Sequence, residues 1–146
     1  KVSSQGATLG LRYLLSRGYS VSTNGTWAKL DLKESDPNKI PPFNTPEWRT
    51  TVMLTKDQIN KPIGFSFAWR WQDSFDWIGT FNGMRPGRIH AYSIVDAQVS
   101  YKLPAMKSKV KLGAFNLFNN QVYQAFGSPA IGAIYYVSLL IDPTIR

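Results

Sequence analysis

The chain has 146 residues, a formal net charge of +8 and no cysteine. This length suits one domain, and the lack of cysteine excludes a disulfide framework and a thiolate metal site within it. The longest uninterrupted apolar runs have only a few residues, such as 139–141, which excludes a membrane-spanning helix of about 20 apolar residues. A transmembrane β-strand needs only about 9–11 residues of alternating character, so its signal is judged by repetition.

The first two predicted strands are joined by a tight turn. Alternating apolar residues predict a strand from 7 to about 16, and a weaker pattern predicts a second from about 19 to 33. Arg17-Gly18 suits the turn between them because glycine readily adopts positive φ. Asn24-Gly25 is a rival hairpin signal, but a break there leaves only the short strand 19–23.

A polar loop with four prolines follows at residues 34–46, which cannot lie inside a sheet. The third predicted strand spans 48–56 and leads into a short turn at 57–62. Trp48, Thr50, Val52 and Leu54 share one side of this strand.

The fourth predicted strand, residues 63–78, has the strongest pattern in the chain. Between 65 and 77 its odd positions are aromatic with the exception of Asp73, namely Phe65, Phe67, Trp69, Trp71, Phe75 and Trp77. The even positions between them are small or polar. Because successive side chains of a strand point to opposite faces, one face is aromatic and the other polar. A face with this many aromatic side chains needs another layer to cover it. If the other strands repeat the same alternation of apolar and polar residues, we expect that layer to be lipid.

Three more strands are predicted at 90–103, 109–118 and 132–141, separated by a turn at 104–108 and a loop at 119–131. A loop at 79–89 precedes them. In the first of the three, Val95, Ala97, Val99 and Tyr101 face one way.

The predicted connections alternate between short and long along the chain. An antiparallel meander with all its short turns at one end and all its long loops at the other is the layout of an outer-membrane barrel. A soluble sandwich has no reason to sort its loops in this way, so we predict an all-β antiparallel meander in a barrel. The aromatic residues expected near the two membrane interfaces are Tyr13, Trp48, Trp69, Trp71, Trp77, Tyr101, Tyr135 and Tyr136.

Several segments resemble the end of a TonB-dependent outer-membrane receptor. The resemblance rests on residues 95–101 (VDAQVSY) and 112–119 (LGAFNLFN), followed by Tyr123, Gly132 and the pair Tyr135-Tyr136. Residues 43–48 (FNTPEW) are similar to the element that opens an inward-running strand in these receptors. Residues 70–75 (RWQDSF) look most like versions from the Bacteroidota.

The resemblance implies a transmembrane barrel of about 22 strands that is closed by an N-terminal plug. Residues 1–146 would then be the C-terminal portion, the last seven or so strands, with the plug and the N-terminal strands absent from this chain. The start at Lys1 without an initiator Met or a secretory signal fits a processed, engineered or partial chain. Members often end on an aromatic residue; residues 142–146 here are either a periplasmic tail or a variant assembly signal.

The implied function is uptake of a scarce nutrient (a metal chelate, glycan or peptide) with energy transmitted by TonB. The implied partners are outer-membrane lipid and lipopolysaccharide, the plug and the remaining barrel strands, TonB through the N-terminal region, and a surface lipoprotein as an open alternative. Nucleic acid is not among them.

The expected ligand contacts lie on the long loops and on the polar face of the aromatic strand, because binding residues concentrate on loops held by rigid scaffolds. They are Asn82, Arg85, Arg88, His90, Gln121, Tyr123, Gln124 and Phe126 from the loops, and Arg70 and Gln72 from the strand. The alternative is an ordinary solvated loop and lumen wall. The residues expected to face lipid are Phe65, Phe67, Trp69, Trp71, Val95, Ala97, Val99 and Tyr101.

Four lysines gather around one short turn, at Lys102, Lys107, Lys109 and Lys111. They lack the recognition helix or aromatic platform of a nucleic-acid site. We expect them at the level of the lipid headgroups, with their aliphatic stems in the apolar zone.

The chain offers no residues for catalysis. His90 is its single histidine, and it has no Gly-x-Ser-x-Gly elbow, phosphate loop or closely spaced carboxylate pair. We therefore expect no catalytic residue, no cofactor and no metal site. Two rivals stay open: a soluble all-β carbohydrate-binding module with Trp69, Trp71 and Trp77 as its platform, and a small passive porin.

Overall fold

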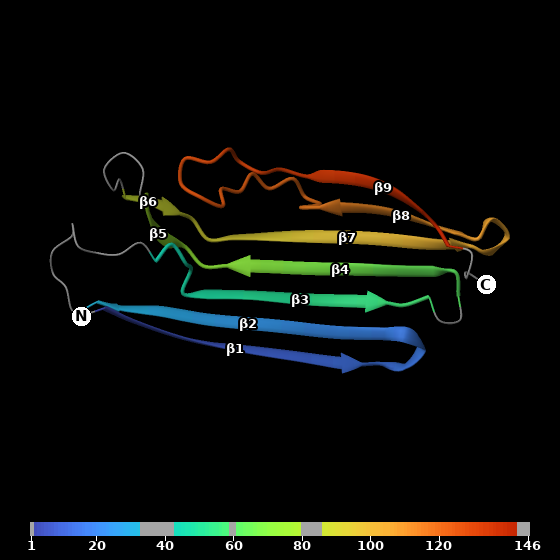
Figure 1. Ribbon diagram of the computed structural model, residues 1–146, viewed down its shortest axis with the longest axis horizontal. Coiled ribbons are helices and arrows are strands. Elements are labelled where there is room, and N and C mark those ends of the chain that lie inside the picture. The colour runs from blue at the N-terminus through green and yellow to red at the C-terminus, as the bar shows by residue number, and fades with distance from the viewer. Residues whose placement is uncertain (1, 33–42, 59–60, 80–85, 143–146) are drawn as a thin grey trace.

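The computed structural model describes residues 2–32, 43–58, 61–79 and 86–142. Nine strands are found in these residues, and Figure 1 shows the long ones side by side. They are β1 (Val2–Leu14), β2 (Tyr19–Leu32), β3 (Trp48–Lys56), β4 (Ile63–Gln72), β5 (Phe75–Ile78), β6 (Pro86–Ile89), β7 (Tyr92–Leu103), β8 (Ser108–Phe115) and β9 (Ile134–Ile141). In the part of the chain described, no helix is long and apolar enough to cross a membrane.

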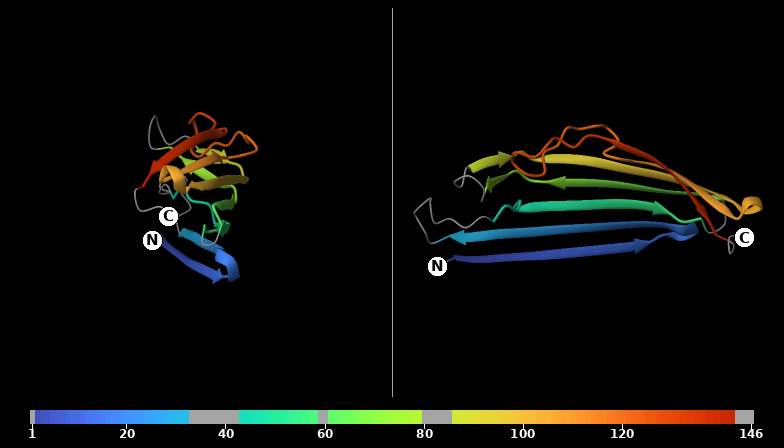
Figure 2. Two further views of the ribbon diagram at one scale, coloured as in Figure 1. Left: turned by 90° about the vertical axis from the view of Figure 1, so that its right-hand side faces the viewer. Right: turned by 45° about the horizontal axis from the view of Figure 1, so that its top comes forward.

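Seven of the strands form one antiparallel sheet in the order β1-β2-β3-β4-β7-β8-β9. Every neighbouring pair in it is also a sequential pair, apart from the excursion through β5 and β6, which form a separate two-stranded sheet. The end-on view in Figure 2 shows that the sheet is curved. The all-β antiparallel meander expected from the alternation is therefore confirmed.

The register places most of the large apolar residues of the seven strands on one face. Residues directly opposite each other share a face, and one such row runs from Val21 through Leu54, Phe67, Ala97 and Ala114 to Tyr135. Parallel rows carry the other residues that were expected to face lipid, so that set does share one face. We call it the apolar face, and the opposite one the inner face.

The apolar face is exposed rather than buried under a second layer. Val137 is 76% exposed, Leu112 50% and Phe67 42%. The buried hydrophobic residues of the described chain are Ile89, Ile94, Ala114 and Val122, so the sheet has no ordinary apolar core. The described residues contain no second sheet that shields the indoles of β4, as a soluble sandwich would require.

The sorting is confirmed for the connections that the structure describes, while most of the predicted loop 34–46 lies outside the described residues. The short turns after β1, β3 and β7 lie at one end of the sheet, and the excursions after β4 and β8 lie at the other (Figure 1). Arg17 and Gly18 both adopt positive φ in the first turn, whereas Asn24 and Gly25 lie inside β2. The Arg17-Gly18 turn was thus the correct choice.

The predicted strand 63–78 is two strands. Asp73 continues the ladder through its N–H to the Trp48 carbonyl oxygen (2.9 Å), but its own carboxylate then accepts the N–H of Ser74 (2.6 Å). Such a local bond from Asp to the next backbone N–H favours a turn over an extended strand. The chain leaves the large sheet there, and β5 pairs with β6, a strand that lies within the predicted loop 79–89.

Two predictions about orientation were wrong. Tyr136 was expected at the interface, but it follows Tyr135 directly and therefore points to the inner face, where its hydroxyl donates to Gln98 Oε1 (2.9 Å). The lysines around the turn were expected against lipid headgroups. Instead Lys102, Lys109 and Lys111 lie on the inner face, and the Lys102 ammonium donates to the Gln58 carbonyl oxygen (3.1 Å). The headgroup level of the four lysines, including Lys107 in the turn, stays a prediction.

Candidate functional site

The loop between β8 and β9 is built around Asn116. This residue is 4% exposed and adopts positive φ (53°), which asparagine tolerates better than most residues. Its side-chain amide donates to the Asn120 carbonyl oxygen (2.7 Å) and accepts the Asn120 N–H (3.1 Å). Asn119, also at positive φ, accepts the Ala133 N–H (2.9 Å) where the loop returns. These bonds end β8 at Phe115, three residues before the predicted end, and hold the loop over the sheet.

Asp96 connects this loop to the inner face of the sheet. One carboxylate oxygen pairs with Arg70 Nη2 of β4 (2.6 Å), and the other accepts the N–H of Asn116 (2.9 Å). The Asp96 side chain is 17% exposed. One carboxylate in β7 therefore fixes an arginine of β4 and the start of the loop after β8.

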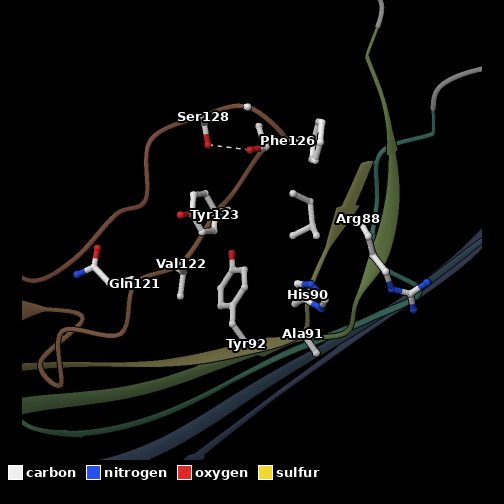
Figure 3. A pocket seen from close by; sticks show the side chains of 12 residues that line it. Arg88, His90, Ala91, Tyr92, Gln121, Val122, Tyr123, Phe126 and Ser128 are labelled. Atoms are coloured by element: carbon white, nitrogen blue, oxygen red, sulfur yellow. Dashed lines mark hydrogen bonds between the residues drawn. The ribbon is translucent and has the colours of Figure 1, made fainter. Parts of the chain in front are cut away.

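A cavity of about 590 Å³ lies between this loop and the segment from β6 to β7 (Figure 3). Ile89 and Val122, both buried, contribute apolar side chains to it. Tyr92 extends from the start of β7 toward Tyr123 of the loop (Figure 3). The remaining lining includes His90, Gln121 and Phe126, which are exposed. We call this space the aromatic cavity.

Phe126 closes one side of the aromatic cavity by packing against glycine. A Cβ atom at Gly87 of β6 would lie 2.2 Å from the Phe126 ring, so only glycine fits there. The Ser128 hydroxyl donates to the Ala125 carbonyl oxygen (2.8 Å), which closes the turn that carries Phe126. The loop after β8 and the β5–β6 hairpin are thereby held together.

Arg88 lines the aromatic cavity through its backbone region but its side chain points away from it (Figure 3). The guanidinium donates to Asp76 Oδ1 (3.3 Å) and to the Ser74 hydroxyl (3.0 Å) across the hairpin. The positive charge of Arg88 is therefore paired within the β5–β6 hairpin and is not directed into the cavity.

A second hollow of about 370 Å³ adjoins the aromatic cavity on the inner face. Its lining combines two neighbouring rows of the sheet, one from Asn24 to Ile94 and the other from Thr26 to Tyr92, with Gln124 of the loop above them. Arg49 and Gln72 lie opposite each other in it, and Arg70 lies diagonally across from Arg49. We call this space the polar hollow. Tyr92 lines both spaces.

The structure brings most of the candidate ligand residues to these two neighbouring spaces. The aromatic cavity is lined by Arg88, His90, Gln121, Tyr123 and Phe126, and the polar hollow by Arg70, Gln72 and Gln124. Asn82 and Arg85 lie outside the described residues. Arg88 belongs to a strand rather than to a loop.

Two residues of these spaces, Tyr92 and Arg49, and Asp96 beside them were not predicted as site residues. Tyr92 lies within the strand predicted at 90–103 and was not predicted to bind a ligand. Its even number puts its side chain on the polar face of that strand, together with Asp96. Arg49 lies in the strand predicted at 48–56, on the side opposite Trp48, Thr50, Val52 and Leu54. Asp96 was used for the family resemblance alone, whereas its position as an acidic residue beside Arg70 on the same face was a usable signal for a cross-strand pair.

No family model matches the chain, and no curated protein matches its sequence. Solved structures do match its fold. The FrpB iron transporter from Neisseria meningitidis superposes with a TM-score of 0.71 at 14% identity, over 94% of this chain and 23% of that chain. The ferric citrate transporter FecA gives 0.69 at 16% identity, over 95% and 24%. The ferric-catecholate import receptor Fiu from E. coli K12 gives 0.67 at 16% identity, over 95% and 21%.

The chain therefore has the fold of the barrel portion of TonB-dependent receptors, as the motifs around Asn116 indicated. The matched structures are transporters and receptors, not enzymes. The chain spans less than a quarter of the length of each of these three. At 14–16% identity, the likeness concerns the fold alone.

Proposed function

We propose that this chain is the C-terminal portion of a TonB-dependent transporter in the bacterial outer membrane. In this proposal the apolar face contacts lipid, with lipopolysaccharide in the outer leaflet, and the inner face contacts the plug and the passing nutrient. TonB acts through the N-terminal region and supplies the energy for uptake. A surface lipoprotein lid and an origin in the Bacteroidota stay predictions that rest on sequence resemblance.

The exposed apolar face is the observation that carries the proposal. A row of Phe, Leu and Val side chains across seven strands costs free energy in water, at roughly 25 cal/mol for each Å² left uncovered. Lipid removes that cost without a second protein layer. The opposite face is polar, as expected for a barrel with an aqueous or plugged interior.

The two edges of the sheet support a larger barrel. β1 and β9 each have a neighbour on one side only, so one side of each strand has no backbone partner within the described sheet. Unpaired backbone groups inside a bilayer cost several kcal/mol each, which is why membrane strands occur in closed barrels. Additional strands of the same protein would satisfy both edges.

Among a metal chelate, a glycan and a peptide, we favour a metal chelate as the nutrient. The similar structures carry the names of an iron transporter, a ferric-catecholate import receptor, a ferric citrate transporter and a siderophore receptor. These names describe the matched proteins and not this chain. We favour a metal chelate because all four names refer to iron or to a siderophore.

Uptake of radiolabelled iron tests the proposal. Ferric citrate and a ferric catecholate are supplied to cells with the gene intact, with the gene deleted, and with TonB deleted. We expect both deletions to lower the uptake of at least one of the two chelates to the same background. Uptake that survives the loss of TonB but not of this protein would instead establish a passive porin.

Extraction behaviour separates the transporter from the soluble carbohydrate-binding module. A barrel segment stays with outer membranes through high-salt washes and is released by detergent, whereas a module is released without detergent. The proposed indole platform is also divided, since Trp69 and Trp71 lie in β4 and Trp77 lies in the separate hairpin.

A further inference from the structure

The aromatic cavity and the polar hollow differ in chemistry although they adjoin. They share Tyr92, and three consecutive loop residues divide between them, since Tyr123 and Ala125 line the first and Gln124 lines the second. A solute that enters at the loop end of the sheet therefore meets both.

The aromatic cavity offers rings and no directed charge. Its rings come from Tyr92, Tyr123 and Phe126, with the imidazole of His90 beside them. Arg88 contributes a guanidinium that points outward to Asp76, and none of the described lining residues is acidic. Faces of aromatic rings bind flat rings by stacking and edge contacts.

The polar hollow offers positive charge. Arg49 and Arg70 both line it, while the carboxylate that neutralises Arg70, Asp96, is outside the lining. The Arg70 side chain stays 44% exposed beside Asp96, and within the described residues Arg49 makes no ion pair. A guanidinium with unused donors is suited to a carboxylate, phosphate or phenolate group.

We propose that the two spaces form one site for a solute that carries a planar ring with an anionic substituent. The ring lies against Tyr92, Tyr123 and Phe126, and the anionic group reaches Arg49 and the exposed part of the Arg70 side chain. This assignment rests on the proposed uptake function and names the chemical class of solute that this part of the wall selects. A small aliphatic anion would leave the aromatic cavity unused, and a neutral ring would leave the polar hollow unused.

Fluorine NMR on the full-length protein in detergent micelles tests the proposal with three probes. The probes are 4-fluorobenzoate, with ring and anion, 4-fluorobenzyl alcohol, with the ring alone, and trifluoroacetate, with the anion alone. We expect line broadening to give a dissociation constant for the benzoate that is about fivefold to tenfold lower than for either other probe, since two modest contacts combine.

Matched variants assign the two halves of the site. Tyr123→Leu keeps apolar bulk but removes a ring, and it is expected to weaken both ring-bearing probes by about fivefold. Arg49→Gln is expected to remove the preference for the benzoate over the alcohol and to leave alcohol binding unchanged. Arg12→Gln removes an inner-face guanidinium that lines neither space, and it should leave all three dissociation constants as they were.

Equal binding of the benzoate and the alcohol, or an equal effect of Arg12→Gln and Arg49→Gln, would overturn the proposal. So would trifluoroacetate binding as tightly as the benzoate. The assay needs neither TonB nor an energised membrane. If the NMR assay gives a negative result, the proposed ligand site is wrong, but the transport function is still tested separately by the iron uptake experiment.

Discussion

At the scale of single residues, the inner face depends on a few close contacts that the strand pattern alone does not reveal. Tyr136 lies across Gly113 of the neighbouring strand, and a Cβ atom at Gly113 would lie 2.3 Å from the tyrosine ring. The glycine thus makes room for the ring whose hydroxyl reaches Gln98.

Gly113→Ala is expected to displace Tyr136 and to lower the free energy of unfolding by about 1–3 kcal/mol, the range for overpacking. Urea titration of the full-length protein in lipid bilayers measures it. Gly25→Ala is the matched control, because Gly25 is also a strand glycine and a Cβ there meets no atom within 4 Å. Equal losses in the two variants would show that the ring contact is unimportant.

Asp96 holds three parts of the chain together, so its replacement should cost more than that of an exposed partner. Asp96→Ala leaves Arg70 and the Asn116 N–H without their acceptors, at an expected cost of about 2–3 kcal/mol. Asp96→Asn keeps an oxygen for the N–H and is expected to cost about half as much. The unfolding free energy in bilayers is again the measurement.

Asp76 provides the control for this prediction. Its pair with Arg88 is longer (3.3 Å) and its side chain is 74% exposed, and exposed ion pairs contribute less than about 1 kcal/mol. If Asp76→Ala destabilises the protein as much as Asp96→Ala, the proposed role of Asp96 is wrong.

At the scale of elements, alternation was sufficient to predict the seven strands of the large sheet. β3 has the predicted bounds 48–56, and β2 differs by one residue at its end. Alternation succeeds there because one face of every strand is apolar and the other polar, which fixes the side-chain period at two.

The same alternation failed where polar side chains bond locally to the backbone. Asp73 ends β4 by accepting the N–H of Ser74, although aromatic residues continue at 75 and 77. Asn116 ends β8 in the same manner, although Leu117 and Phe118 follow. A periodic apolar pattern carries no information about such bonds. The site was predicted as loop residues together with Arg70 and Gln72 of the aromatic strand, while Tyr92 and Arg49 required the register.

A pair of neighbouring substitutions tests the two faces of β4. Phe67→Arg places a charge on the apolar face and is expected to cost about 2–4 kcal/mol if that face meets the middle of the bilayer. Ser66→Arg places the same charge on the inner face and is expected to be tolerated. The fraction of folded protein in outer membranes, read from heat-modifiable mobility on gels, reports the difference. Greater damage from Ser66→Arg would reverse the assignment of the faces.

At the scale of the whole molecule, the sheet is a curved wall with different chemistry on its two sides. The inner face of its strands carries several cations, among them Arg12, Arg49, Lys102 and Lys109, and Asp96 is the carboxylate among its described residues. These four side chains point to the interior of the proposed barrel, because the opposite face of their strands is the apolar face.

The contact between the apolar face and lipid is tested most directly by nitroxide scanning along β4. This chain has no cysteine, so a single introduced cysteine carries the only spin label within it, at each position from 65 to 71 in turn. In outer-membrane lipid, labels at odd positions should collide with oxygen, which dissolves in the bilayer. Labels at even positions should collide with a water-soluble nickel complex. If odd and even positions are equally accessible to nickel, the aromatic residues face water and the account of this chain as a membrane wall is contradicted.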